Sequence, residues 1–365
     1  MRKLPVLGFA TVLFVSCLPV PFDLEISQAL ATAAKMTRDN SGVITASYNQ
    51  GGSQSDFVFF PQVLASGGFD YGAGFVTALA SSSVDLQAVA GGVTYARWNQ
   101  PIPNPDPHAP GYLAWPVKSG TSYLFGIVFD ALYPASGSGY ALFRASPPGT
   151  FSIVTSSSLQ SLSGSTRTVI GASVAANSSP SFDMLHMLTW DPPTQSFVEA
   201  GCQLQASGLT SVTLTRGSLP YPLSFMPTGT SAINRCLYFY DDNPAADPAR
   251  LPNRSFASWY DTPSSSWVTY AWDSLSVFKS LPVPHRLDAL LSTGQLLSTE
   301  DGTGRLYDRD GNLLATFPLG NLVYVAEEYF GGVPRCYFSQ CLVYENQLHF
   351  NIYWIPTSQL ATLAN

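Results

Sequence analysis

Charged side chains are scarce in this sequence, and their scarcity excludes several kinds of partner. Only 11% of its 365 residues are Asp, Glu, Lys or Arg, against roughly 25% in a typical soluble protein. The net charge is −7 and the isoelectric point is near 5.0. Nucleic acid binding needs a stripe of basic side chains, and docking on anionic lipid needs a basic cluster. We therefore expect no nucleic acid partner and no electrostatic docking on a membrane.

The short motifs of common enzyme chemistries are also missing. There is no G-x-S-x-G elbow, P-loop, G-x-G-x-x-G after a strand, or H-E-x-x-H helix. The four histidines are far apart, without ligand spacing: His108, His186, His285 and His349. Carboxylates that are distant in sequence can still meet after folding, so spacing alone does not exclude glycoside hydrolysis. The sequence thus gives no catalytic residue and predicts no cofactor.

Oxygen-rich clusters occur at two places, and both are better explained as turns than as metal sites. Asp241-Asp242-Asn243 with Asp247 offers ligands that suit Ca²⁺, but a solvated turn is the favoured interpretation. The segment 308–312 superficially resembles a calcium loop. Its sixth and twelfth positions are Leu313 and Leu319, where an EF-hand needs Gly and Glu. We expect a hairpin turn there and no metal.

No apolar run reaches the ~20 residues of a membrane-spanning helix, yet a shorter run stands at the N-terminus. Met1-Arg2-Lys3 is followed by thirteen residues without charge, Leu4 to Ser16. A basic start and a short apolar run are typical of a secretory signal. We expect residues 1–16 to be a signal peptide and the protein to be exported.

The end of this run, Leu13-Phe14-Val15-Ser16-Cys17, resembles the lipobox of bacterial lipoproteins. In that family a small residue precedes a cysteine that is lipidated and becomes the mature N-terminus. Phe14 stands where Leu is common, as in the loosened lipoboxes of spirochaetes. The resemblance implies lipidation of Cys17 and attachment to an envelope membrane, because several acyl chains anchor stably. The alternative is an ordinary signal cleaved after Ala29-Leu30-Ala31.

With Cys17 lipidated, residues 17–40 would form a tether. Within it, Ser27–Lys35 is rich in residues that favour a helix. Four cysteines follow: Cys202, Cys236, Cys336 and Cys341. An even number in an exported protein allows up to two disulfides. On one strand the last two would be roughly 16 Å apart on opposite faces, too far to bridge. Cys202–Cys236 is the better candidate pair, and buried free thiols are the alternative.

Beyond residue 40 no convincing amphipathic helix appears, and short alternating strands recur to the end. We expect strands in many segments, for example Asp56–Leu64, Ser122–Phe129, Asp183–Trp190, Ser266–Trp272 and Gln347–Ile355. Many short strands with turns between them indicate an all-β sandwich, barrel or propeller. We predict that residues 41–365 form a β-propeller of six to eight blades, with tandem β-sandwich domains as the alternative.

Similar hairpins favour the propeller. Trp190–Val198 and Tyr260–Val268 each read aromatic-Asp, a turn with Pro, then aromatic-Val; Tyr307–Leu314 has a similar shape. Arg235–Phe239 resembles Arg335–Phe338. An aromatic-Asp at a strand end resembles the blades of β-propellers. The offsets are 70, 47 and 100 residues, of which the last two suit blades of about 50 residues.

Aromatic side chains give the remaining functional lead. Six of them lie within 35 residues of one another and could bind a protein or a glycan: Tyr238, Tyr240, Trp259, Tyr260, Trp267 and Trp272. Packing between blades is the alternative. The sequence therefore predicts an envelope lipoprotein that acts as a non-enzymatic binding or scaffold module. The alternatives are a carbohydrate-binding protein or hydrolase on a propeller, and a surface adhesin.

Overall fold

The computed structural model describes part of the chain. The backbone is described for residues 20–44, 54–63, 69–79, 83–90, 93–101, 112–117, 123–129, 139–146, 150–158, 168–175, 183–191, 193–194, 196–205, 208–209, 213–219, 236–241, 254–261, 264–272, 278–344 and 347–364. Side chains are described at position 24, over 26–38 and, with gaps, from residue 171 onward. The signal peptide and Cys17 lie outside the described residues.

The described strands form six blades. Blade 1 contains β2 (Gln54–Val63), β3 (Phe69–Leu79), β4 (Ser83–Ala90) and β5 (Val93–Pro101). Blade 2 contains β6 (Tyr112–Val117), β7 (Tyr123–Phe129), β8 (Gly139–Ser146) and β9 (Thr150–Ser158). Blade 3 contains β10 (Thr168–Ala175), β11 (Asp183–Asp191), β12 (Ser196–Gln205), β13 (Gly208–Leu209) and β14 (Thr213–Leu219).

The second half of the ring follows the same plan. Blade 4 contains β15 (Cys236–Asp241), β16 (Arg254–Asp261), β17 (Ser266–Trp272) and β18 (Phe278–Leu281). Blade 5 contains β19 (Ala289–Leu290), β20 (Leu296–Ser298), β21 (Thr303–Tyr307) and β22 (Leu313–Pro318). Blade 6 contains β23 (Leu322–Phe330), β24 (Val333–Tyr344) and β25 (Gln347–Pro356), and its fourth strand is β1 (Thr37–Ile44).

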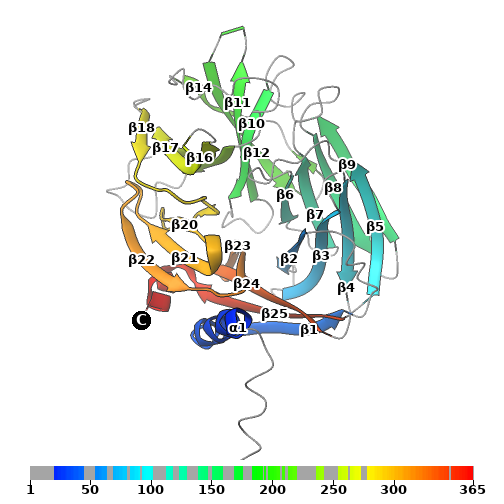
Figure 1. The fold of residues 1–365 in the computed structure, drawn as a ribbon. Helices are drawn as coiled ribbons and strands as arrows, with labels where there is room; N and C mark the ends of the chain where they lie inside the picture. Colours follow the sequence, from blue (N-terminus) through cyan, green and yellow to red (C-terminus); the bar gives the residue numbers. More distant parts are fainter. Residues whose placement is uncertain are drawn as a thin grey trace, which may run out of the picture.

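The blades are arranged as a β-propeller (Figure 1). Within each blade, strands that follow one another in sequence pair antiparallel, except that β14 pairs with β12 and β1 pairs with β25. The first strands of neighbouring blades meet at the centre: β2 lies against β6, β6 against β10, β15 against β19, and β23 against β2. β10 and β15 even pair in parallel, which joins blades 3 and 4 into one sheet. The propeller prediction is confirmed, since two sandwich domains would not produce this ring.

An N-terminal strand closes the ring. β1 pairs antiparallel with β25, from Thr37 opposite Trp354 to Ile44 opposite Leu348. The first and last parts of the described chain therefore share one blade. This pairing removes the free edge that β25 would otherwise present, and such edges favour unwanted association between sheets.

The segment before β1 forms a helix that packs against the propeller, and this helix begins earlier than the one predicted from Ser27. α1 spans Val20–Ala33 and includes most of the helix predicted from Ser27. Its residues Ala29, Thr32 and Ala33 are buried, and the Thr32 hydroxyl donates to the carbonyl of Pro318 in β22. Folded structure thus extends back through β1 and α1, and β1 crosses the predicted boundary between tether and propeller at residue 41.

One apolar cluster explains why this segment folds onto the body. Ala29 and Ala33 of α1 pack with buried side chains from blades 5 and 6, including Phe317 and Phe338. η3 (Thr357–Ala364), a 3-10 helix that sequence patterning did not reveal, adds Leu360 and Leu363 to the same cluster. Burial of such side chains is the main favourable term in folding. Among the described helices, none has the length and apolar character needed to cross a membrane.

Close packing in blade 5 accounts for one glycine. A Cβ atom on Gly304 in β21 would lie 2.0 Å from the ring of Phe317. Phe317 is itself fully buried in the cluster beneath α1. Any larger residue at position 304 would have to push this ring aside, at a typical cost of about 1–3 kcal/mol.

The predicted hairpin turn at 308–312 is confirmed between β21 and β22. The Asp308 carboxylate accepts hydrogen bonds from the N–H groups of Asp310 (2.8 Å) and Asn312 (2.9 Å), and from the side-chain amide of Asn312 (2.8 Å). Burial alone would raise the pKa of Asp308, but these hydrogen bonds outweigh it and lower the pKa below its usual value.

This turn makes stability depend on pH in a defined direction. A carboxylate with a lowered pKa stabilises the fold above its unfolded pKa of about 3.9, and loses that contribution as the pH falls through the folded value. We expect Asp308→Ala to cost about 1 kcal/mol at pH 7. In urea titrations, its difference from the natural chain should shrink below about pH 4. A difference that stays constant down to pH 3 would contradict this explanation.

Candidate functional site

At one end of the boundary between blades 4 and 5, partly exposed polar side chains lie together with aromatic ones. Three connections meet there: the β16–β17 turn, the β18–β19 connection and the β20–β21 turn. They meet because alternate turns of antiparallel strands lie at the same end of a blade, where the chain also crosses to the next blade. We call the cluster formed by Tyr260, Trp267, His285, Arg286 and Glu300 the upper groove.

Glu300 lies at the centre of the upper groove. Its carboxylate accepts a hydrogen bond from the indole N–H of Trp267 (3.0 Å) in blade 4. It also accepts one from the backbone N–H of Arg286 (3.4 Å). The Nδ1 atom of His285 lies 3.6 Å from the Oε2 atom of Glu300. One carboxylate thus joins both blades and the segment that connects them.

Asp288 fixes the same connection from its other side. It accepts hydrogen bonds from the backbone N–H (2.6 Å) and hydroxyl (2.7 Å) of Thr299. It also pairs with the guanidinium of Arg286 through Nε (2.9 Å) and a terminal nitrogen (2.9 Å). Both guanidinium nitrogens meet the same oxygen, Oδ1 of Asp288, and this double contact limits the movement of the side chain. Arg286 is therefore held in place while remaining accessible.

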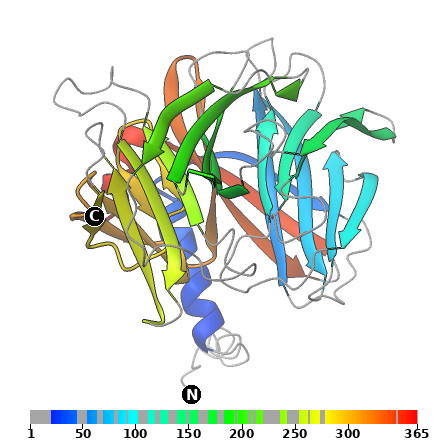
Figure 2. The same ribbon diagram turned by 90° about the horizontal axis from the view of Figure 1, so that it is seen from above.

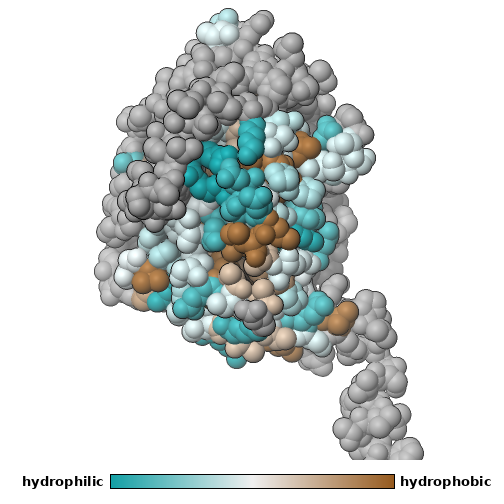
Figure 3. Space-filling view, turned by 90° about the vertical axis from the view of Figure 1, so that its left-hand side faces the viewer, coloured by the Kyte–Doolittle hydropathy of each residue, from teal (hydrophilic) through white to brown (hydrophobic). Residues whose placement is uncertain are grey.

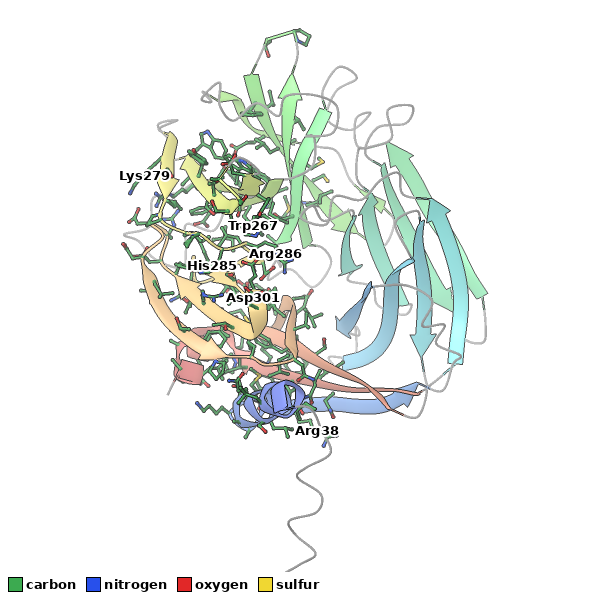
Figure 4. All side chains as sticks on the ribbon, viewed as in Figure 1. Arg38, Trp267, Lys279, His285, Arg286 and Asp301 are labelled. Atoms are coloured by element: carbon green, nitrogen blue, oxygen red, sulfur yellow. The ribbon has the colours of Figure 1, made fainter. Side chains whose placement is uncertain are left out.

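The polar groups of the upper groove face solvent to different degrees. The side chains of Arg286, His285 and Glu300 are 45%, 29% and 26% exposed. Next to Glu300, Asp301 is exposed and adopts a left-handed backbone (φ 55°), which a residue other than glycine rarely adopts and which concentrates at functional sites. Figure 4 shows Trp267, His285, Arg286 and Asp301 close together, with Lys279 further out on blade 4.

This arrangement is suited to binding. Guanidinium, imidazole and carboxylate groups supply fixed hydrogen-bond donors and acceptors. The ring of Tyr260 meets Trp267 edge to face, with centroids 5.8 Å apart, and adds partly exposed aromatic surface. Among the described residues, no group of three His, Cys, Asp or Glu side chains is placed to hold a metal ion. The partly exposed side chains of the upper groove could therefore contact a polar ligand.

At the other end of the same boundary, ion pairs join blades 4 and 5. Arg309 pairs with Asp241 (2.9 Å), and Asp310 pairs with Arg254 (3.0 Å) and Lys279 (3.7 Å). Asp241, considered above as a possible calcium ligand, is instead buried against a guanidinium. The remaining members of that predicted cluster, at positions 242, 243 and 247, lie outside the described residues. These ion pairs hold blades 4 and 5 together at this end.

Most of the predicted binding aromatics prove to be packing residues. Tyr238, Tyr240, Trp267 and Trp272 are at most 8% exposed. This corrects the prediction that they offer a binding surface, because both faces of blade 4 are covered by neighbouring blades: Tyr238 contacts Glu199 of blade 3, and Trp267 contacts Glu300 of blade 5. Trp259 and Tyr260 are partly exposed. The indole of Trp259 stacks on Tyr270, with centroids 4.9 Å apart, so these two rings and Tyr260 are the aromatics left for a surface role.

A buried carboxylate between blades 3 and 4 was missed by sequence reasoning. Glu199 in β12 is fully buried. It accepts a hydrogen bond from the hydroxyl of Tyr238 (2.5 Å) in β15 and another from the hydroxyl of Ser255 in β16. Buried charges persist only when they are well paired. The available signal was a Glu alternating with apolar residues in a strand, which does not identify its partners.

The cysteines also depart from the prediction. Cys202 is a free buried thiol, so the predicted Cys202–Cys236 disulfide is wrong. The reason is topological: β11 and β10 lie between β12 and β15 in the sheet, which separates the two positions by roughly 14 Å, three strand spacings. Disulfides need Cα atoms within about 7 Å. Cys336 is likewise a free buried thiol, which agrees with the alternative of unpaired cysteines.

Both thiols should resist modification in the folded protein. Burial raises the pKa of Cys202 to about 12. Burial and then the nearby Glu327 raise the pKa of Cys336 well above its ordinary value. Because the thiolate is the reactive form, iodoacetamide at pH 8 should leave both unmodified until denaturant is added. Peptide mass mapping measures this, and rapid alkylation of Cys202 under native conditions would contradict its burial.

Comparison with known proteins gives distant structural likeness alone. No protein-family model and no curated protein matches this sequence. A calcium-binding regucalcin from Agrobacterium tumefaciens C58 shares 12% identity over 86% of this chain and 94% of that chain, with a TM-score of 0.35. The Dos1 propeller shares 9% over 80% and 81%, with a TM-score of 0.32. A mannose phosphorylase from Leishmania mexicana shares 8% over 93% and 95%, with a TM-score of 0.31. At these TM-scores the propeller fold rests on the chain's own strand pairing.

Proposed function

We propose that this protein is an exported lipoprotein whose propeller acts as a non-enzymatic binding module at a bacterial envelope membrane. Two features of the sequence support the anchor: the signal-like residues 1–16 and the lipobox-like Ser16-Cys17. A rigid propeller that presents one accessible polar site supports the binding role. Acyl chains on Cys17 would hold the module at a membrane, and the upper groove would contact its partner.

The observation that carries the binding role is the accessible but fixed Arg286. Its side chain is 45% exposed, yet two of its guanidinium nitrogens contact Oδ1 of Asp288. Ordering a free arginine on binding costs roughly 0.5–1.5 kcal/mol, and most of that cost is met here in the free protein. Accessible arginine side chains are also enriched among residues that dominate the energy of protein interfaces. A preorganised Arg beside His285 and Glu300 therefore favours a specific polar partner.

Site-specific crosslinking in cells tests this role. A photoreactive amino acid replaces Asp301 in the upper groove, and the matched control replaces Lys279, an exposed residue at the opposite end of blade 4. We expect one discrete adduct from position 301 and none from position 279. Its yield should fall when Arg286 is changed to Ala. The same adducts from both positions, or none from either, would contradict a binding site in the upper groove.

A glycan is the second candidate ligand, and the partly exposed ring of Tyr260, which meets the buried Trp267 edge to face, favours it. Aromatic surface beside carboxylate and guanidinium groups offers both stacking and hydrogen bonds. The purified propeller, applied to a panel of glycans, should then retain one class of sugar, and Tyr260→Ala should abolish retention while Trp259→Ala does not. A panel without retained sugars would leave a protein partner as the proposal.

A further inference from the structure

Helix α1 has an outer face that the propeller does not cover. Leu24 and Leu30 are 59% and 53% exposed, although they are large apolar side chains. The other exposed positions on the described part of the helix are Ser27 and Ala31. Of these four exposed positions, three are apolar and one, Ser27, is polar. The opposite face is buried through Ala29, Thr32 and Ala33, so the helix cannot turn its leucines inward.

The orientation of α1 is fixed at its C-terminal end. The Lys35 ammonium donates to the carbonyl of Leu363 in η3 (3.1 Å), and Arg38 donates to the side chain of Asn351 in β25 (3.0 Å). Figures 1 and 2 together show α1 running roughly along the propeller axis, with its N-terminal end projecting beside the blades. The helix therefore projects in a fixed direction beside blade 6.

The length of chain before α1 identifies what covers the outer face. Only residues 18 and 19 separate Cys17 from Val20, where the helix begins. Even fully extended, the three steps from Cys17 to Val20 span about 11 Å. A lipidated Cys17 would bring the first turns of α1 to the bilayer interface, where exposed leucines beside a lipid anchor gain apolar contact.

We propose that α1 lies on the membrane and that its outer face, through Leu24 and Leu30, is a bilayer contact that orients the propeller. This inference rests on the proposed lipid anchor at Cys17. In place of a flexible tether, α1 would hold the propeller directly at the membrane surface. We call this the α1–membrane contact. The contact is apolar rather than electrostatic, because α1 contains the acidic residues Asp23 and Glu25 and no base.

Another apolar patch on the surface has no comparable link to the anchor. Figure 3 shows hydrophobic side chains gathered on the rim that carries β18 and β22, with hydrophilic side chains around them. On β22, Leu313 and Leu314 are 55% and 51% exposed. They are thus as exposed as the leucines of α1, but they follow Cys17 by nearly 300 residues and nothing in the chain directs them to a membrane.

Fluorescence quenching on phosphatidylcholine vesicles tests the proposal. The full-length protein is purified from membranes with an environment-sensitive fluorescent amino acid at position 30, and matched proteins carry it at position 301 or 314. We expect nitroxide-labelled lipid to quench position 30 several-fold more strongly than position 301, and aqueous iodide to show the reverse order. Position 301 is the decisive control, because the upper groove must stay open to a partner.

The possible outcomes distinguish the α1–membrane contact from the lipid anchor on Cys17. If the protein stays on the vesicles but iodide quenches position 30 as well as position 301, the helix does not lie on the membrane and the anchor survives. If position 30 is shielded from both quenchers only at high protein density, a second copy covers α1 and the proposal is wrong. If the intact mass shows no acyl chains and the protein does not bind the vesicles, both the lipid anchor and the α1–membrane contact are contradicted.

Discussion

A chain that begins at residue 45 is expected to lose much of its stability, because the ring can no longer close. It lacks β1, which pairs with β25 over the length of that strand, and α1, which contributes Ala29 and Ala33 to the cluster between blades 5 and 6. Each backbone hydrogen bond contributes about 1 kcal/mol net. The total loss is then several kcal/mol, a large share of the roughly 5–15 kcal/mol that stabilise a typical protein.

Urea unfolding followed by circular dichroism measures this effect. A chain that begins at residue 20 is the control and should match the longer protein. A synthetic peptide of residues 20–44 should restore the stability of the shorter chain when added in excess, since a segment that binds only the folded state stabilises it. Equal unfolding midpoints for the chains that begin at 20 and 45 would show that β1 and α1 do not close the ring.

The second large effect is expected from Arg309→Met at the ion-paired end of the groove. Asp241 is 3% exposed and Arg309 17% exposed, so the substitution leaves a buried carboxylate without its main counter-charge. Breaking one partner of a buried pair typically costs about 3–5 kcal/mol. The free energy of unfolding from urea titrations should fall by about this amount.

A neighbouring pair provides the control for this prediction. Lys279 and Asp310 are 3.7 Å apart, and both side chains are more than half exposed. Exposed pairs contribute about 0–1 kcal/mol, so Lys279→Met should change stability very little. The double variant with Asp241→Asn and Arg309→Met should recover part of the loss, because no charge remains buried. Equal losses from the two single variants would contradict the burial of the Asp241–Arg309 pair.

The repeated hairpins show how far sequence patterns could go. Asp191 and Asp261 both end the second strand of a blade, so the segments 190–198 and 260–268 occupy equivalent places in blades 3 and 4. Their offset of 70 residues had seemed too long for a blade. The difference comes from the long connections at 220–235 and 242–253, which lengthen the repeat without changing the strands.

The other repeats were similar for a local reason only. Tyr307-Asp308 ends the third strand of blade 5, and therefore lies at the opposite end of its blade from Asp261. Arg235-Cys236 leads into the first strand of blade 4, whereas Arg335-Cys336 lies in the second strand of blade 6. Hairpins share turn chemistry whatever their place in a fold. The pattern thus predicted the strands and fold class, and the blade positions required the strand pairing.

The candidate site could not be assembled from the sequence because its parts are distant and individually ordinary. Trp267, His285 and Glu300 carry no common motif, and they meet only because three connections of blades 4 and 5 end at one place. The predicted aromatics were identified by their density in the sequence, which does not distinguish an inward from an outward face. Burial in a propeller is decided by the neighbouring blade, which lies far away along the chain.

Intact-mass analysis of the native protein tests whether the proposed lipid on Cys17 holds this propeller at an envelope membrane. The protein is purified from membranes beside a Cys17→Ala variant. We expect a mass that corresponds to cleavage before Cys17 plus acyl chains, and we expect the variant to lose both this mass and its association with the membrane. A mass for cleavage after Ala31 without lipid would contradict both the lipid anchor and the α1–membrane contact. It would point to a freely exported binding protein.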